Sequence, residues 1–161
     1  MPVTVVLDRL RSAFNVGNIF RVAEALRVEE IIACGYTAHP PHPKVEKTAR
    51  GCDRLVSCRH VETAVQAVCE LRSRGVSVYA VETVEGAVPV WDAQLRFPAA
   101  LVLGNEALGV SADVLAHCDG AISLPRFGCK NSINVGNCAA VVLYHAARIW
   151  HSREKEVSSA R

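Results

Sequence analysis

The sequence predicts one α/β domain, built on a mostly parallel sheet that helices flank on both faces. Short apolar strands alternate with helical segments, and we find no linker or internal repeat between them. A chain of 161 residues can bury one substantial core but hardly two. We therefore assign residues 1–161 to a single domain.

The first part of the chain reads as strand, helix, strand. Residues 3–7 are apolar and β-branched, as in a buried strand. Apolar side chains recur at helical spacing over residues 16–26, and Asn15 is suited to cap that helix. Residues 31–34 form the second strand. Three prolines in residues 35–43 then predict an irregular surface loop.

The middle of the chain repeats the alternation. Residues 55–58 and 76–81 are apolar enough for the third and fourth strands. Between them, residues 61–74 show helical spacing and end at Gly75, a typical residue after a helix. Residues 82–98 are mostly loop.

The last part adds two strands and two helices. Residues 99–103 and 121–124 are the fifth and sixth strands, and Ser111 is placed to cap a short helix between them. The final helix starts at about Val135 and runs past Trp150. Because it is apolar on nearly every side, it needs burial on most sides.

Composition limits which cell compartment and which binding partners we expect. Apolar residues make up 50% of the chain, a surplus that suggests a buried oligomer interface, whereas a net charge of +2 does not by itself indicate nucleic acid. The seven cysteines are scattered without a C-x-x-C pair, which predicts reduced thiols in a cytoplasmic protein. The nearest approach to a metal motif is His39-Pro40-Pro41-His42, and we expect no metal and no membrane span.

One polar cluster lies on the first predicted helix. Arg21 is about 150° from the centre of the apolar stripe, so it points away from the core on the side of Asn18. It is either a solvated arginine paired with Glu24 or a contact for an anion such as phosphate. Helical spacing alone favours the solvated arginine.

Two further clusters follow predicted strands. The fifth strand runs directly into Gly104-Asn105-Glu106, at the sheet edge where open α/β sheets bind ligands. A plain turn would explain Gly104 but leaves Glu106 without a role, and neither glycine-rich nucleotide fingerprint is present. After the sixth strand, Ser132 and Asn134 stand before the last helix, where capping is the simplest role.

Together the three clusters resemble the motifs of the SpoU/TrmH family of RNA ribose 2′-O-methyltransferases, in the SPOUT superfamily. The resemblance covers essentially the whole chain, and three ordered motifs are far more specific than one. The matching segments are Asn15-x-Gly17-x-x-x-Arg21-x-Ala23, Leu103-Gly104-Asn105-Glu106-x-x-Gly109 and Ile122-x-Leu124-Pro125-x-x-Gly128-x-x-x-Ser132-Ile133-Asn134-Val135. The Pro-Pro-His-Pro-Lys segment with Lys47-Thr48 resembles a subgroup of this family.

The resemblance implies a fold, a cofactor and an assembly. The C-terminal part would form a deep trefoil knot, which the periodicity of the sequence does not predict. The knot would hold S-adenosylmethionine, and the protein would be a homodimer in which one subunit's arginine helps to complete the other's site. The cofactor-binding positions implied for this chain are Val81, Leu103, Gly104, Ile122, Leu124, Ser132 and Asn134.

The resemblance also implies catalytic roles. Arg21 is the candidate for activating the ribose 2′-hydroxyl. Because the pKa of arginine is above about 12, orientation and charge stabilisation suit Arg21 better than proton removal. Asn15, Glu106 and Ser132 would position Arg21, the ribose or the loop. Many relatives have serine where Gly136 stands, a difference that bears on how the last helix is capped.

Substrate recognition would fall to the catalytic domain, since we see no separate RNA-binding extension. The candidates for phosphate contacts are basic residues, each of which could equally be a solvated surface charge. They are Arg9, Arg11, Lys44, Lys47, Arg50, Arg126 and Lys130.

The leading hypothesis is methyl transfer to a ribose of structured RNA, tRNA or rRNA, with tRNA favoured. An alternative is an RNA- or cofactor-binding module of the same fold that has lost catalysis. A nucleotide enzyme of the Rossmann type is disfavoured by the missing glycine fingerprint.

Overall fold

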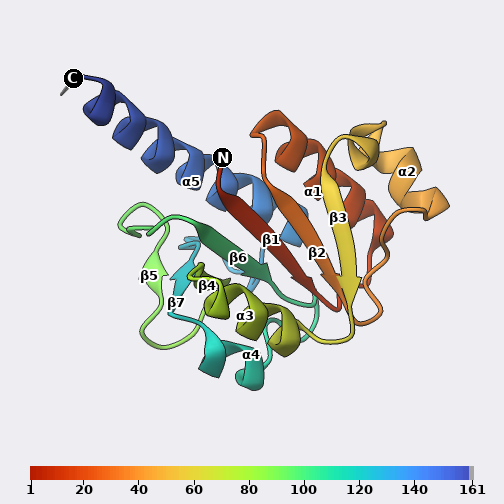
Figure 1. Cartoon of the computed structure of the whole chain (residues 1–161). Coiled ribbons are helices and arrows are strands. Elements are labelled where there is room, and N and C mark those ends of the chain that lie inside the picture. Colours follow the sequence, from red (N-terminus) through yellow and green to blue (C-terminus); the bar gives the residue numbers. More distant parts are fainter. Residues whose placement is uncertain (160–161) are drawn as a thin grey trace.

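One seven-stranded sheet forms the centre of the molecule, and all its strand pairs are parallel (Figure 1). The computed structural model describes the backbone of residues 1–159 and the side chains of residues 1–155. The strand order is β3-β2-β1-β6-β4-β7-β5. The strands are β1 (Val3–Asp8), β2 (Glu30–Cys34), β3 (Ser57–Val61), β4 (Ser77–Val81), β5 (Val88–Pro89), β6 (Ala99–Leu103) and β7 (Gly120–Ser123).

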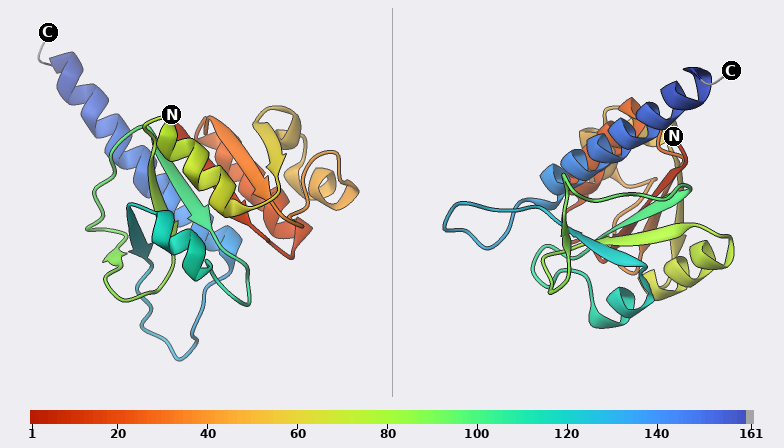
Figure 2. Two further views of the ribbon diagram at one scale, coloured as in Figure 1. Left: turned by 60° about the horizontal axis from the view of Figure 1, so that its bottom comes forward. Right: turned by 90° about the vertical axis from the view of Figure 1, so that its left-hand side faces the viewer.

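Helices cover both faces of this sheet, as predicted (Figures 1 and 2). One face carries α1 (Ala13–Ala25), α2 (Pro43–Ala49), the short 3₁₀ helix Cys52–Arg54 and α5 (Val135–Ser159). The other carries α3 (Ala64–Ser73) and α4 (Ala112–His117). Successive strand residues point to opposite faces, so Val5 belongs to the core under α1 and α5, whereas Val6 belongs to the core under α3.

The connections after β1 and β6 position the site. The chain leaves β1 through α1 toward β2, and it leaves the neighbouring β6 through α4 toward β7. Adjacent strands whose connections diverge in this way leave a crevice beyond their carboxyl ends, where ligands of open α/β sheets bind. The loops that begin at Arg9 and Gly104 therefore meet beside the crevice.

Helix α1 begins earlier than predicted. Ser12, not Asn15, is the N-cap, and its side chain accepts a hydrogen bond from the backbone N–H of Asn15 at 3.3 Å. Asn15 lies in the first turn, and its side chain is free for other partners. Ser111 is the N-cap of α4, as predicted, but its side chain makes no capping hydrogen bond.

Four further elements differ from the prediction. Strand β3 is shifted toward the C-terminus relative to residues 55–58, and the helix predicted over residues 61–74 starts at Ala64 after its N-cap Thr63. The short strand β5 lies in residues 82–98, predicted as mostly loop. Helix α2 was not predicted, and it begins at Pro43, the last residue of the predicted loop.

Gly17 allows α1 and α2 to pack closely. A Cβ atom at Gly17 would lie 2.6 Å from Thr48 Cβ and 2.9 Å from both the Ala49 nitrogen and the Val45 oxygen. Such separations are too short for carbon, and two of the three atoms belong to the backbone of α2. Gly17 is thus needed for helix packing, although it stands beside candidate site residues in the motif.

We expect Gly17→Ala to lower the free energy of unfolding by about 1–3 kcal/mol, because the overlap with α2 outweighs the higher helix propensity of alanine. Urea unfolding of both proteins measures the difference. Gly128→Ala is the matched control, since a Cβ atom there meets nothing within 4 Å. An unchanged Gly17→Ala protein would show that α2 does not hold this position in solution.

Candidate functional site

A cavity of about 600 Å³ opens beyond the carboxyl ends of β4, β6 and β7. All seven positions predicted to bind a cofactor lie along it, together with Glu106. The full lining consists of residues 81–84, 103–110 and 131–135 with Ile122, Leu124, Arg126 and Cys138. Leu103, Ile122 and Leu124 provide apolar surface, and the loops around them present backbone groups.

Gly104 and Asn105 keep the loop after β6 tightly folded. A Cβ atom on Gly104 would overlap the backbone of Gly109 and Val110, so only glycine allows the chain to fold back there. The Asn105 side chain, 4% exposed, accepts hydrogen bonds from the N–H groups of Ala107 at 2.9 Å and Leu108 at 3.0 Å. These contacts fix the shape of one cavity wall.

Glu106 joins this wall to the start of α1. Its carboxylate accepts hydrogen bonds from the N–H groups of Arg11 at 2.7 Å and Ser12 at 3.0 Å, and from the Asn15 amide at 3.0 Å. Burial raises the pKa of Glu106, but these hydrogen bonds together outweigh it and lower the pKa below its ordinary value. Glu106 is therefore an ionised anchor and a poor proton acceptor.

We expect Glu106→Gln to lower the free energy of unfolding by about 1–3 kcal/mol at neutral pH, because the amide oxygen cannot accept all three bonds. The folded protein protonates Glu106 less readily than the unfolded chain does. The carboxylate thus stabilises the fold above the unfolded pKa of about 4.3, and this contribution is lost as pH falls through the lower folded pKa.

Urea unfolding across that pH range tests the assignment. The gap between wild type and Glu106→Gln should narrow as the solution becomes acid. Glu62→Gln, at an exposed position, should show no such gap. A gap for Glu106→Gln that is independent of pH would contradict an ionised anchor.

Asn134 connects the last motif to the other two. Its side-chain nitrogen donates to Asn15 Oδ1 at 3.1 Å, and Asn15 in turn donates to Glu106. Asn134 Oδ1 also accepts from the N–H groups of Gly136 at 2.9 Å and Asn137 at 3.3 Å, so it caps α5. Asn134 thus both caps the helix and lines the cavity.

Ser132 and Gly136 have different surroundings. Ser132 is exposed and lies along the cavity in the loop after β7, which projects from the body of the molecule in both views of Figure 2. A Cβ atom at Gly136 would lie 3.1 Å from Asn134 Oδ1. Glycine at this position therefore leaves room for the capping side chain.

Arg21 is exposed and lies outside the cavity lining. Within the described side chains it has no ion pair, and the predicted pairing with Glu24 is absent. The single chain therefore brings Asn15, Glu106 and Asn134 together but leaves the Arg21 guanidinium facing solvent.

The predicted phosphate contacts fall into two groups. Arg9 pairs with the buried Asp8 carboxylate at 3.0 Å, and Arg126 donates to Thr83 Oγ1 at 2.8 Å. The remaining residues are exposed and form no ion pair within residues 1–155. They are Arg11, Lys44, Lys47, Arg50 and Lys130.

Sequence reasoning missed Glu82 as part of the cavity wall. Its carboxylate accepts from the N–H of Val110 at 2.9 Å and from that of Thr83 at 2.8 Å, and it lies where a Cβ atom on Gly109 would be. Its place directly after β4 was the available signal, because the carboxyl end of each parallel strand meets the same sheet edge.

The described residues contain neither a cluster suited to a metal ion nor a helix suited to span a membrane. Within them, no group of three or more His, Cys, Asp and Glu side chains is arranged to hold a metal ion. No helix in this part of the chain has the length and hydropathy required to cross a membrane.

Comparisons with known proteins agree on one family. A model described as the SpoU rRNA Methylase family matches residues 2–144. A tRNA (guanosine(18)-2′-O)-methyltransferase of Thermus thermophilus is 34% identical over 145 residues, covering 90% of this chain and 74% of that protein. A 23S rRNA (uridine(2479)-2′-O)-methyltransferase of Streptomyces viridochromogenes is 33% identical, covering 89% of this chain and 52% of that protein.

Solved structures share the fold. The SpoU methyltransferase AviRb from Streptomyces viridochromogenes, in complex with AdoMet, has a TM-score of 0.83 at 28% identity, covering 90% of this chain and 56% of that one. The A. aeolicus TrmH/SpoU tRNA modifying enzyme has a TM-score of 0.84 at 26% identity, covering 99% of this chain and 79% of that one. This chain thus spans from about half to about three quarters of the length of its curated relatives. It belongs to the SpoU family of RNA 2′-O-methyltransferases.

Proposed function

We propose that this protein transfers a methyl group from S-adenosylmethionine to a ribose 2′-hydroxyl of RNA. The observation that carries the proposal is the hydrogen-bonded chain Asn134–Asn15–Glu106, which joins all three motifs at the mouth of one cavity. The tRNA and rRNA methyltransferases compared above are 34% and 33% identical to this chain. Both are named for methylation of a ribose 2′-oxygen, although their RNA substrates differ.

The cavity suits the cofactor in size and chemistry. A volume of about 600 Å³ lies within the range of small-molecule sites. Leu103, Ile122 and Leu124 offer apolar surface for an adenine ring, and the backbone of the flanking loops offers hydrogen bonds to its edge. When bound, S-adenosylmethionine supplies the methyl group on its sulfonium.

The protein's own groups hold and orient the reactants. Glu106 and Asn15 fix the start of α1 against the cavity wall, and Ser132 lies on the loop over the opening. We assign Arg21 to orienting the ribose and its phosphate, because a guanidinium offers a planar fork of donors and stays charged at neutral pH.

We further propose a homodimer, because Arg21 lies outside the cavity of its own chain. The apolar side chains Val141 and Tyr144, 46% and 59% exposed, share one face of α5 at a spacing of three residues. A second copy covering this face would bury them and could bring Arg21 of the partner subunit to the cavity.

We also propose a knotted C-terminal part, a single cytoplasmic domain and a tRNA substrate. The last motif and α5 would complete a trefoil knot; the wrapping of the β4, β6 and β7 loops around one cavity supports this reading. Residues 1–161 would act as one domain in the cytoplasm, and tRNA is the favoured substrate over rRNA.

Incubation with labelled S-adenosylmethionine and separate tRNA and rRNA pools tests the reaction. Digestion of the product should release a 2′-O-methylated nucleoside, and the labelled pool identifies the substrate class. Label on a base with none on ribose would overturn the proposal. Cofactor binding without transfer to either pool would support a binding module instead.

A further inference from the structure

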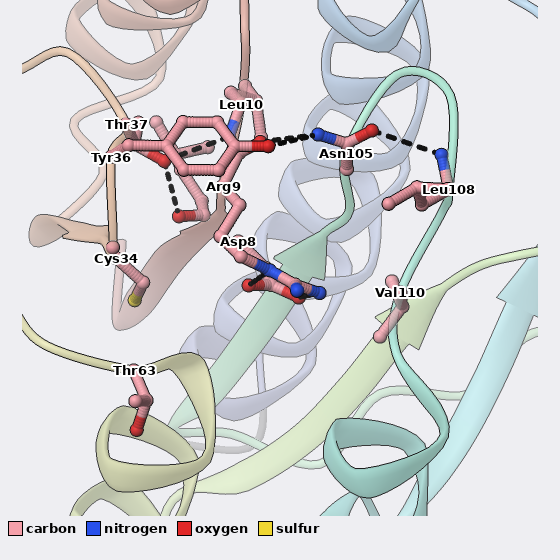
Figure 3. A network of polar contacts seen from close by, with 12 residues as sticks. Asp8, Arg9, Leu10, Cys34, Tyr36, Thr37, Thr63, Asn105, Leu108 and Val110 are labelled. Atoms are coloured by element: carbon pink, nitrogen blue, oxygen red, sulfur yellow. Dashed lines mark hydrogen bonds and ion pairs between the residues drawn. The ribbon is translucent and has the colours of Figure 1, made fainter.

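A rigid aromatic surface lies in the crevice between the loops of β1, β2 and β6, next to the cavity. Its centre is Tyr36, whose side chain is 61% exposed although its hydroxyl is fixed. That hydroxyl accepts a hydrogen bond from the Asn105 amide at 2.8 Å, as Figure 3 shows. The ring is therefore open to solvent while its far end is held in place.

The same amide shapes the cavity wall. Asn105 donates to the Arg9 carbonyl at 2.7 Å and to Tyr36. Its side-chain oxygen accepts from the N–H of Leu108, as Figure 3 shows, and also from that of Ala107. One buried side chain therefore sets both the position of the Tyr36 ring and the shape of the predicted cofactor loop.

The backbone near Tyr36 enters the left-handed region at two positions. Arg9 and Gly35 both have positive φ angles, 52° and 61°. A Cβ atom on Gly35 would lie 3.0 Å from Arg9 Cγ, so the arginine chain packs against this glycine. Non-glycine residues in the left-handed region concentrate at functional sites, where the surroundings maintain them.

Two histidines are bonded to the residues on either side of Tyr36. His39 and His60 stack with their ring centroids 4.7 Å apart, and they donate to the carbonyls of Thr37 at 3.1 Å and Gly35 at 2.7 Å. The charges nearby suit a polyanion, since Arg11 is exposed and has no ion pair with any described side chain, and the buried Asp8 is paired with Arg9. Stacked rings interleaved with cations are typical of surfaces that bind single-stranded nucleic acid.

We propose that Tyr36 is a substrate-positioning residue whose ring stacks on a nucleobase of single-stranded RNA, with His39 and His60 continuing the stacking surface. This inference rests on the proposed function, because the stacked base would lie next to the ribose that receives the methyl group. Asn105 then links the position of the stacked base to the shape of the cavity wall.

Binding of two short RNAs by the full chain tests the platform. One is a single-stranded oligoribonucleotide of about twelve residues, within the usual site size of such surfaces, and the other has the same length and charge but abasic sites. We expect Tyr36→Leu to weaken binding of the base-bearing RNA about tenfold and to leave the abasic RNA unaffected. Fluorescence anisotropy at fixed salt measures both affinities.

Matched variants separate stacking from structure. Tyr36→Phe keeps the ring and should retain the preference for bases, while Trp91→Leu removes an exposed ring next to β5, at the far edge of the sheet, and should change nothing. In the methylation assay, Tyr36→Leu should raise KM for RNA far more than it lowers kcat. A purely structural role would lower kcat and stability together.

The possible results distinguish failure of the stacking proposal from failure of the proposed methyl transfer. Equal weakening for both RNAs, or none, overturns the stacking proposal even if the wild type methylates ribose. A changed sedimentation coefficient with unchanged RNA affinity also overturns it and assigns the ring to contact with a second copy. Base-dependent binding through Tyr36 without methyl transfer by the wild type overturns the proposed reaction alone.

Discussion

Replacing Arg21 with alanine is expected to reduce kcat for methyl transfer about 10²- to 10³-fold, the loss typical when one charge-stabilising group is removed. Stability should change by no more than about 0.5 kcal/mol, because the side chain is exposed and unpaired within the described residues. Cofactor affinity should also persist, since Arg21 is absent from the cavity lining. Single-turnover methylation, urea unfolding and calorimetry with S-adenosylhomocysteine measure the three quantities.

Two further variants define what Arg21 contributes. Arg21→Lys keeps the charge but not the planar fork, so we expect an intermediate rate. Arg96→Ala removes an exposed arginine from the loop before β6, outside the cavity lining, and should leave kcat unchanged. Full activity of Arg21→Ala would remove Arg21 from the mechanism.

Mixed dimers test whether Arg21 acts across the interface. Arg21→Ala and a variant with a damaged cofactor cavity, Gly104→Ala, are each expected to be nearly inactive. If Arg21 serves the partner's cavity, a mixed dimer has one site with both defects and one site with neither, so activity returns on mixing. If Arg21 serves its own cavity, both sites remain defective and no activity returns.

The sequence located the strands that are buried along their whole length and missed two short elements that are mostly exposed or half-buried, α2 and β5. Strands β1 and β6 are fully buried runs, so hydropathy alone located them. Helix α2 buries only Val45 and Ala49, one turn apart, and it follows a run of prolines typical of a loop. Its packing depends on Gly17, a contact between segments that no local pattern contains.

The candidate site was predicted one motif at a time, and its connections depended on the fold. The residue types of Asn15, Glu106 and Asn134 marked them as polar groups near element ends. That they form one hydrogen-bonded chain follows from the adjacency of β1 and β6, which the sequence does not specify. Tyr36 had no signal at all, because its role depends on a partner 69 positions away.

Gly104→Ala is expected to destabilise the protein by about 3 kcal/mol and to reduce methyl transfer about 100-fold, the cost of misplacing a wall of the site by roughly 1 Å. The added Cβ atom would meet the backbone of Gly109 and Val110, which cannot rotate away as a side chain could. Relief requires opening the turn in which Asn105 and Gly109 exchange backbone hydrogen bonds. That movement would also shift Asn105 and the anchor Glu106.

Cofactor binding separates this effect from general unfolding. Gly17→Ala is also destabilised by a backbone clash, but its clash lies between α1 and α2 and outside the cavity lining. Calorimetry with S-adenosylhomocysteine, below the unfolding transition of both variants, should therefore show weakened binding for Gly104→Ala and near-normal binding for Gly17→Ala. Only Gly104→Ala shifts the loop after β6. Equal affinity in the two variants would therefore mean that this loop does not form the cofactor wall.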